Sequence, residues 1–238
     1  MEQQRVFLTA EWINLVMMNY SVDPSLLEPL VPHGTILDDF EGKFYLSLIG
    51  FEFNRSRIYG FPIPFHQTFE EVNLRFYVRR GEKRGAAFIR ELVPKRAVAA
   101  IARLAFNENY AYVPMTHRIE RGALGDIQAA EFSWGRKPKR SSMQLQTEGE
   151  SFLAPEGSLS QFITEHYWGY AAQADGGCLE YEVEHPRWKV WAAKDAQFVG
   201  DGAWTYDAEF AEVLAHGPDS AFMAEGSPVT VSKGIRID

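Results

Sequence analysis

Two neighbouring segments, residues 71–79 and 85–93, alternate polar and apolar side chains with the period of two that is typical of β-strands. A charged turn, RRGEKR, joins them. If they pair antiparallel with residue numbers that sum to 164, Asn73 lies opposite Glu91 on a polar face and the other face is apolar. A shift of one residue would mix the two faces, so the pattern predicts this hairpin in this register.

The polar face of this hairpin is the first candidate for a functional surface. The same register places Arg75 opposite Ile89, and it places the end of the face next to the start of a helix. We therefore expect Asn73, Glu91 and Arg75 to contact a small-molecule ligand. The residues that gather at the end of the face are Glu71, Asn73, Glu91 and Lys95.

Strand signals dominate the rest of the chain. Short alternating segments recur from residue 44 to residue 231, separated by Gly, Pro and charged turns. In residues 42–53 the alternation slips at Gly50, which predicts a bulge or bend, as at the corner of a barrel. We expect a β-dominated α+β fold in which helices pack around a barrel-like antiparallel sheet.

Four helical segments interrupt the strands. The second one should bury Ile101 and Ala105 and leave Arg103 largely exposed, because its apolar residues form a single stripe. The third opens with Ser158 and Gln161, which have the spacing of a capping box. The four segments are residues 24–32, 96–106, 158–171 and 207–217.

Length and composition narrow the class of protein. A chain of 238 residues with 46% hydrophobic residues can bury a sizeable core, and we find no repeat or linker, so we expect a single domain over residues 1–238. The net charge of −8 argues against a nucleic-acid partner. No signal peptide and no membrane-length apolar segment is recognisable, and Cys178 is the single cysteine, so we expect a cytoplasmic protein. Whether it forms homo-oligomers stays open.

The segment RELVPKRA resembles the motif of acetoacetate decarboxylases, in which a lysine after Pro forms a Schiff base with the substrate. The wider pattern is similar to an uncharacterised branch of that superfamily, the YqjF-like domain of unknown function 2071. The matching segments are YSVDPSLLEPLVPHGTILDDFEGKFYLSLIGFEF, EVNLRFYV, GSLSQFITEHYWGYA and HPRWKVW. The resemblance implies a conical or barrel-like antiparallel sheet that encloses a cavity.

Carried over by position, the resemblance implies catalytic roles for three residues. Lys95 matches the Schiff-base lysine, Glu71 matches an upstream glutamate, and Arg96 takes the place of a second lysine that keeps the first one neutral. A free lysine has a pKa of ~10.4, and lowering it to ~6 requires roughly 6 kcal/mol of destabilisation of the cation. Burial, a neighbouring cation and a helix N-terminus all act in that direction. The other interpretation is that Lys95 and Arg96 both extend into solvent.

Other candidate groups are less specific. Glu165 is a further candidate for ligand binding, although a capping or ion-pair role is equally compatible with its position. It neighbours His166 on a predicted helix, so the two side chains point about 100° apart. The histidines lack the spacing of metal ligands, and no phosphate loop or dinucleotide motif occurs, so we expect no metal and no cofactor.

Two functions are compatible with these observations. One is a decarboxylase-like enzyme that acts on a small keto acid or a related carbonyl compound through Lys95. The other is a non-catalytic barrel that binds a small apolar or acidic ligand. Both require a cavity, and the position of the Lys95 side chain relative to that cavity distinguishes them.

Overall fold

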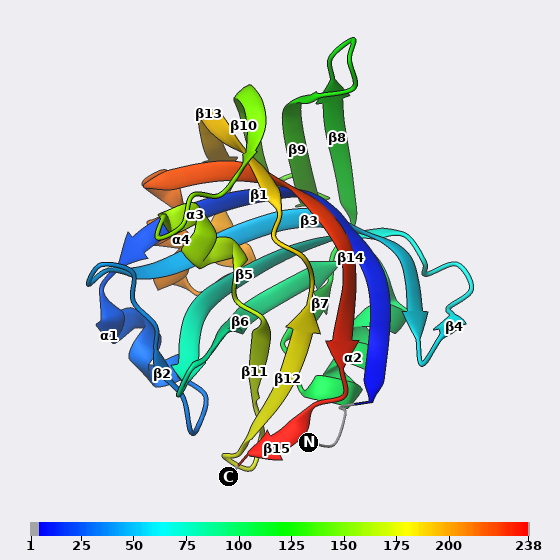
Figure 1. Cartoon of the computed structure of the whole chain (residues 1–238), viewed down its shortest axis with the longest axis vertical. Helices are drawn as coiled ribbons and strands as arrows, with labels where there is room; N and C mark the ends of the chain where they lie inside the picture. Colours follow the sequence, from blue (N-terminus) through cyan, green and yellow to red (C-terminus); the bar gives the residue numbers. More distant parts are fainter. Residues whose placement is uncertain (1–4, 238) are drawn as a thin grey trace.

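The computed structural model describes residues 5–237, which form one 15-stranded, strongly curved sheet with helices around it (Figure 1). Seven strands make a cone: β1 (Val6–Val22), β3 (Phe44–Ile58), β5 (Phe69–Arg80), β6 (Lys83–Val93), β11 (Trp168–Ala172), β12 (Cys178–Glu184) and β14 (Ser220–Ser232). The sheet continues from β14 into β13 (Lys189–Val199), β10 (Lys139–Leu153), β9 (Ile127–Arg136) and β8 (Met115–Arg121), at the top of Figure 1.

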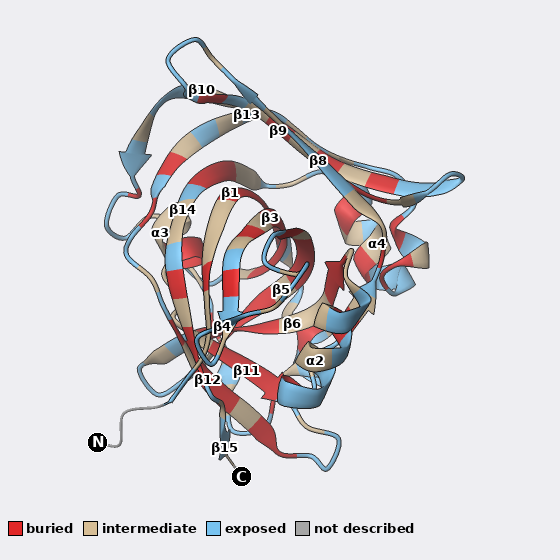
Figure 2. Cartoon of the chain, turned by 90° about the vertical axis from the view of Figure 1, so that its right-hand side faces the viewer, coloured by how far each residue is buried: buried red, intermediate tan, exposed pale blue. Residues whose placement is uncertain are grey.

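Short elements complete the fold. The remaining strands are β2 (Ile36–Leu37), β4 (Phe61–Pro62), β7 (Tyr110–Tyr112) and β15 (Ile235–Ile237). The helices are α1 (Pro24–Leu27), α2 (Arg96–Phe106), α3 (Leu159–Thr164) and α4 (Ala208–Ala215), with 3-10 turns at Glu28–Leu30 and Gly202–Trp204. Figure 2 shows α2 and β4 on the side of the molecule that faces the viewer.

The cone is brought together by two short pairings. β11 pairs with β6 through Trp168–Gly85 and Gly169–Ala86, and β12 pairs with β14 through Val183–Val231 and Glu184–Thr230. Each of these two pairings joins only two residue pairs, so the ring of strands is held at short contacts and the barrel is not strictly closed. The predicted β-dominated α+β fold with a barrel-like sheet and packed helices is confirmed, but the sheet is not wholly antiparallel, because β6 pairs parallel with both β11 and β7.

The predicted hairpin is present, and its register is confirmed over its first half. Asn73 lies opposite Glu91, as expected. After Leu74 the register shifts by one residue, so the predicted pairing of Arg75 with Ile89 is wrong and Arg75 lies opposite Phe88. The extra residue in β6 is a β-bulge, which alternation alone does not reveal.

The bulge predicted at Gly50 lies instead in the neighbouring strand. β3 pairs with β5 without interruption through Gly50, whereas β1 shifts register against β3 between Ile13 and Val16, where Asn14 has a φ of 57°. Gly50 has a packing role, because a Cβ there would lie 2.9 Å from the Phe132 ring.

Helix α2 has the predicted bounds, and it is rotated slightly relative to the predicted stripe. Arg103 is exposed, as expected, but Ala105 is also exposed, and Ile101 is half-buried. The helix instead buries Ala99 and Phe106. The reason is that the Phe106 ring packs edge-on against Phe7, with ring centroids 5.0 Å apart, and anchors the end of the helix.

Ser158 caps α3 as predicted, but the return bond of Gln161 goes to the residue before the cap, so the capping box is only half formed, and the predicted length of the helix is wrong. The Ser158 hydroxyl accepts a hydrogen bond from the Gln161 amide N–H at 3.2 Å, and the Gln161 side chain accepts one from the Gly157 N–H at 2.6 Å. The helix ends at Thr164, and the chain then enters β11.

Candidate ligand cavity

A cavity of about 140 Å³ lies inside the cone, between the inner face of the sheet and helix α2. Most of its wall is apolar and aromatic, including Trp12, Phe51, Phe53, Phe69, Ile101 and Ala102. Its volume is similar to that of an apolar cavity of about 150 Å³ that accommodates benzene. The wall therefore suits a molecule of roughly benzene size.

One part of the wall is polar and begins on β5. Glu71 and Asn73 point to the same face, because they are two residues apart on a strand. The Asn73 amide donates to Glu71 Oε1 at 3.0 Å, and the Tyr110 hydroxyl donates to Glu71 Oε2 at 3.1 Å. Glu71, Asn73 and Tyr110 are all buried. The Glu71 carboxyl is thus held in one orientation by two neighbours.

Two further carboxyl groups join Glu71. Glu91 faces Asn73 across the β5–β6 pairing, and its carboxyl group shares a hydrogen bond with that of Glu108. The Tyr181 hydroxyl of β12 donates to Glu108 Oε1. We call Glu71, Glu91 and Glu108 the carboxyl cluster.

Burial controls the protonation of the carboxyl cluster. Burial raises the pKa of Glu71 from its usual 4.5 to about 7, against the hydrogen bonds from Asn73 and Tyr110. Burial also raises the pKa of Glu108 to about 7. The pKa of Glu91 is raised well above its usual value, first by burial and then by the charges of Glu108 and Glu71. Glu91 therefore holds its proton more tightly than a free glutamate does, and the hydrogen bond it shares with Glu108 has Glu91 as the donor.

A βαβ crossover assembles this cluster. β6 carries Glu91, the chain crosses through α2, and β7 returns parallel to β6 with Tyr110 beside Glu91. Sequence reasoning missed Glu108, Tyr110 and Tyr181. The signal that could have found the first two is the alternation of ENYAY directly after a helix that follows a strand.

A second polar group lies elsewhere in the same wall. His166 lines the cavity, and its Nε2 lies 3.2 Å from Asp38 Oδ2. Arg84 Nε donates to the same Asp38 oxygen at 2.6 Å. Burial lowers the pKa of His166 from 6.5 to about 4, although Asp38 opposes this shift. The imidazole is therefore neutral at pH 7 and oriented by Asp38.

Arg75, one of the residues expected to contact a ligand, lines the cavity, and its charge acts on both Glu71 and His166. Its Nη2 donates to the Ile163 carbonyl at 3.1 Å, and its Nε lies 3.4 Å from the Tyr77 hydroxyl. These contacts fix the guanidinium on the wall near the end of α3.

Among residues 5–237, which the structure describes, the ones that line the cavity include neither Lys95 nor Arg96. The strand ends at Val93, Pro94 turns the chain, and Lys95 becomes the N-cap of α2 with a half-buried side chain. Arg96 is exposed and lies over the Tyr112 ring, 4.8 Å from its centroid. The strand pleat that would have continued from Glu91 to Lys95 is thus broken at Pro94.

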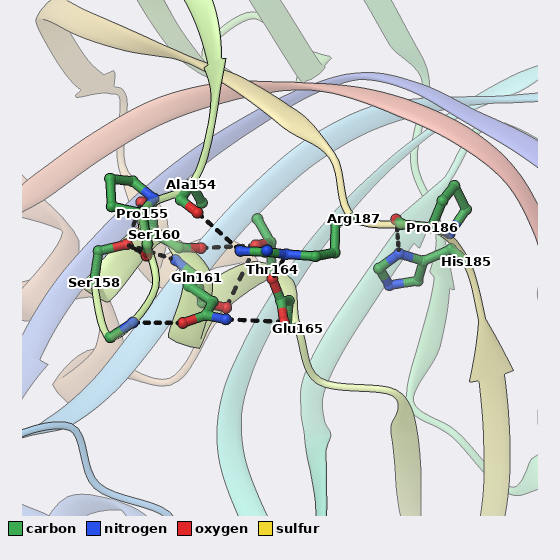
Figure 3. A network of polar contacts seen from close by, with 11 residues as sticks. Ala154, Pro155, Ser158, Ser160, Gln161, Thr164, Glu165, His185, Pro186 and Arg187 are labelled. Carbon is green, nitrogen blue, oxygen red and sulfur yellow. Dashed lines mark hydrogen bonds and ion pairs between the residues drawn. The ribbon is translucent and has the colours of Figure 1, made fainter.

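Glu165 also lies outside the cavity wall that the described residues form. Its Oε1 accepts a hydrogen bond from Arg187 Nε at 2.5 Å, and its Oε2 accepts one from the Gln161 side chain at 3.2 Å (Figure 3). Arg187 also donates to the Ala154 carbonyl at 2.9 Å. In this arrangement Glu165 forms an ion pair that ties α3 to the segment before β13.

Buried polar atoms without a protein hydrogen-bond partner are concentrated around the cavity. Among the described residues there are eight such side-chain atoms, and five of them belong to residues of the cavity wall. Because buried polar atoms are nearly always paired in native proteins, this concentration indicates a place where a ligand completes the hydrogen bonds. The five atoms are Trp12 Nε1, Ser56 Oγ, Asn73 Oδ1, Glu91 Oε2 and His166 Nδ1.

No group of three or more His, Cys, Asp or Glu side chains in residues 5–237 is arranged to hold a metal ion. No helix in the same range is long and apolar enough to span a membrane.

The sequence matches a protein family over most of its length. The model of the family DUF2071, described as an uncharacterized conserved protein, matches residues 9–228. The uncharacterized protein YqjF of Bacillus subtilis (strain 168) is 28% identical over 181 residues, which cover 74% of this chain and 72% of YqjF.

Solved structures share the fold at low sequence identity. Acetoacetate decarboxylase from Legionella pneumophila superposes with a TM-score of 0.72 at 10% identity, over 98% of this chain and 88% of that one. The enduracididine biosynthesis enzyme MppR, complexed with pyruvate, gives a TM-score of 0.70 at 11% identity, over 100% and 92% of the two chains. The chain therefore has the acetoacetate decarboxylase-like fold that its sequence predicts.

Proposed function

The chain belongs to the uncharacterized family DUF2071, and we propose that it is a barrel that binds a small, mainly apolar molecule in the cavity inside its cone. The observation that carries this proposal is the concentration of five unpaired polar atoms in the wall of a benzene-sized apolar cavity. The apolar wall provides affinity through desolvation, and the unpaired atoms provide orientation. The complex of MppR with pyruvate supports the proposal, because a relative in fold takes up a small molecule.

Ligand binding can be tested with molecules of six heavy atoms. We expect the full chain to bind cyclopentanol with a dissociation constant of ~1 mM or tighter, as is reachable for so small a ligand. The variant Ala102→Trp should lose this binding by roughly tenfold or more, because an indole at this position fills the cavity. Ligand-observed NMR and calorimetry measure the two constants.

The matched control is Ala100→Trp, an exposed position on the same helix, which should bind as the unchanged chain does. Far-UV circular dichroism would establish that both variants are folded. Equal binding by the two variants would place the ligand outside the cavity and overturn the proposal.

The Schiff-base reaction through Lys95 requires that the Lys95 side chain reach a bound keto acid. Because Lys95 does not line the cavity, we expect pyruvate and borohydride to give no covalent adduct that depends on Lys95. Intact-protein mass spectrometry between pH ~5 and ~9 is the measurement, a range in which a lysine with a strongly lowered pKa would react. An adduct that is lost in Lys95→Ala and kept in Lys43→Ala would favour the enzyme instead.

A further inference from the structure

The polar end of the cavity is short of hydrogen-bond donors. The Tyr110 hydroxyl and the Asn73 amide both donate to Glu71, and the Tyr181 hydroxyl donates to Glu108. The proton on Glu91 is also used, because it lies in the hydrogen bond to Glu108. The donors contributed by these neighbours are therefore already engaged within the cluster.

The unpaired atoms at this end are both acceptors. Asn73 Oδ1 and Glu91 Oε2 are buried and have no partner in the protein, and their residues are only 3% and 2% exposed. They face each other across the β5–β6 pairing, where the Cβ atoms of opposite residues are ~4.5–5.5 Å apart. Because the two residues are direct neighbours across the strand pair, a single nitrogen with two N–H donors is the kind of group that can bridge their acceptors.

Charge favours the same kind of ligand. Three carboxyl groups share this end of the cavity, and the charge of Arg75 acts on one of them, Glu71, but the hydrogen bonds of Arg75 go to the Ile163 carbonyl and the Tyr77 hydroxyl. A buried carboxylate with no directly paired cation is costly, and a cationic donor removes that cost. A neutral acceptor such as a ketone would meet only further acceptors at this end.

We propose that the ligand of this cavity is a small primary amine, bound as its ammonium ion between Asn73 and Glu91 with its apolar part against the aromatic wall. This inference rests on the proposed ligand-binding function and specifies the chemical class of the ligand. The ammonium group supplies the donors and the positive charge that the carboxyl cluster lacks.

The pH dependence follows from the groups that face the ammonium site. These are Glu71 and Arg75 from β5, Glu91 from β6, Glu108 and Tyr110 around the start of β7, and Tyr181 from β12, while α2 contributes apolar side chains. A bound cation stabilises the ionised carboxylates, so binding releases protons from the cluster. Amine affinity therefore rises between pH ~6 and ~8, whereas the affinity for a neutral ligand does not.

The test compares cyclopentylamine with cyclopentanol, which have the same size and differ in charge and donors. Calorimetry on the full chain at pH 7.5 should give a dissociation constant at least roughly tenfold lower for the amine, the range expected for charge-assisted hydrogen bonds in a buried site. Glu91→Gln should abolish this preference, since glutamine cannot release a proton to become the carboxylate that a bound ammonium ion stabilises. The exposed control Glu82→Gln should keep it.

Each outcome separates the two proposals. If cyclopentanol binds in the cavity and the amine binds no better, the amine inference is overturned and the binding function stands. If neither molecule binds, the binding function itself fails. A preference for the amine that persists in Glu91→Gln and in Glu71→Gln would reflect the general attraction of a cation to a chain of net charge −8 and would overturn the inference.

Discussion

Replacing Glu91 by glutamine is expected to raise the free energy of unfolding at pH 8 and to change it much less at pH 5. The reason is that the native state binds a proton at Glu91 more tightly than the unfolded chain does, because burial and the neighbouring carboxylates raise its pKa. Above the unfolded pKa, each pH unit then costs the native state about 1.4 kcal/mol until the folded pKa is reached. Glutamine mimics the protonated carboxyl and removes this cost.

Glu71, whose pKa rises from 4.5 to about 7, shows the direction in which stability changes with pH and the pH range of that change. Between these values the native state holds more protons than the unfolded state, so stability falls as pH rises, by roughly 3 kcal/mol in all. His166 acts in the opposite direction. Because its pKa falls from 6.5 to about 4, its contribution is lost as pH drops below 6.5.

Urea unfolding between pH 5 and pH 8 gives the free energy of unfolding of the unchanged chain and of Glu91→Gln. The difference between the two curves at each pH is the effect of Glu91. The His166 contribution is common to both proteins and cancels in the comparison. Glu82→Gln, which alters an exposed turn, should give a curve parallel to that of the unchanged chain. If the curve for Glu91→Gln is also parallel to that of the unchanged chain, the pKa of Glu91 is not raised in the native state, and the explanation by burial is wrong.

Part of this site was predictable from local sequence. The pairing of Asn73 with Glu91 follows from strict alternation on both sides of a short turn, since a hairpin fixes its own register. The bounds of α2 were predictable because Pro94 precedes the helix and Asn107 ends it in a left-handed conformation, with a φ of 59°. These features depend on neighbours within a few residues.

The rest depends on contacts that alternation does not encode. The bulge in β6 after the Glu91 pairing moved Phe88, in place of Ile89, opposite Arg75. Glu108 enters the cluster only because the crossover through α2 returns a three-residue strand beside β6. Lys95 had the right spacing for the cavity face, but spacing predicts a side-chain direction only while a strand continues, and this strand ends at Val93.

Gly226 of β14 packs against the backbone of Trp12 in β1, and Trp12 belongs to the aromatic part of the cavity wall. Gly226 has a φ of +82° and lies opposite Ile13, and a Cβ at this position would overlap the backbone carbonyl of Trp12 and lie 2.8 Å from Leu15. Gly217, after helix α4, has the same φ of +82°, but a Cβ there would meet nothing within 4 Å. The two glycines share a backbone conformation and differ in the space around them.

Alanine at the two positions should therefore have unequal effects. Gly217→Ala should cost only the left-handed conformation, about 1–2 kcal/mol. Gly226→Ala should cost at least ~3 kcal/mol, because a clash with backbone in a paired strand requires the strands to separate. Denaturant unfolding measures both, and displacement of Trp12 should also weaken cyclopentanol binding in Gly226→Ala alone. Equal losses of stability would mean that β1 and β14 are not in close contact at Gly226. Trp12 would then be held in the cavity wall by other contacts.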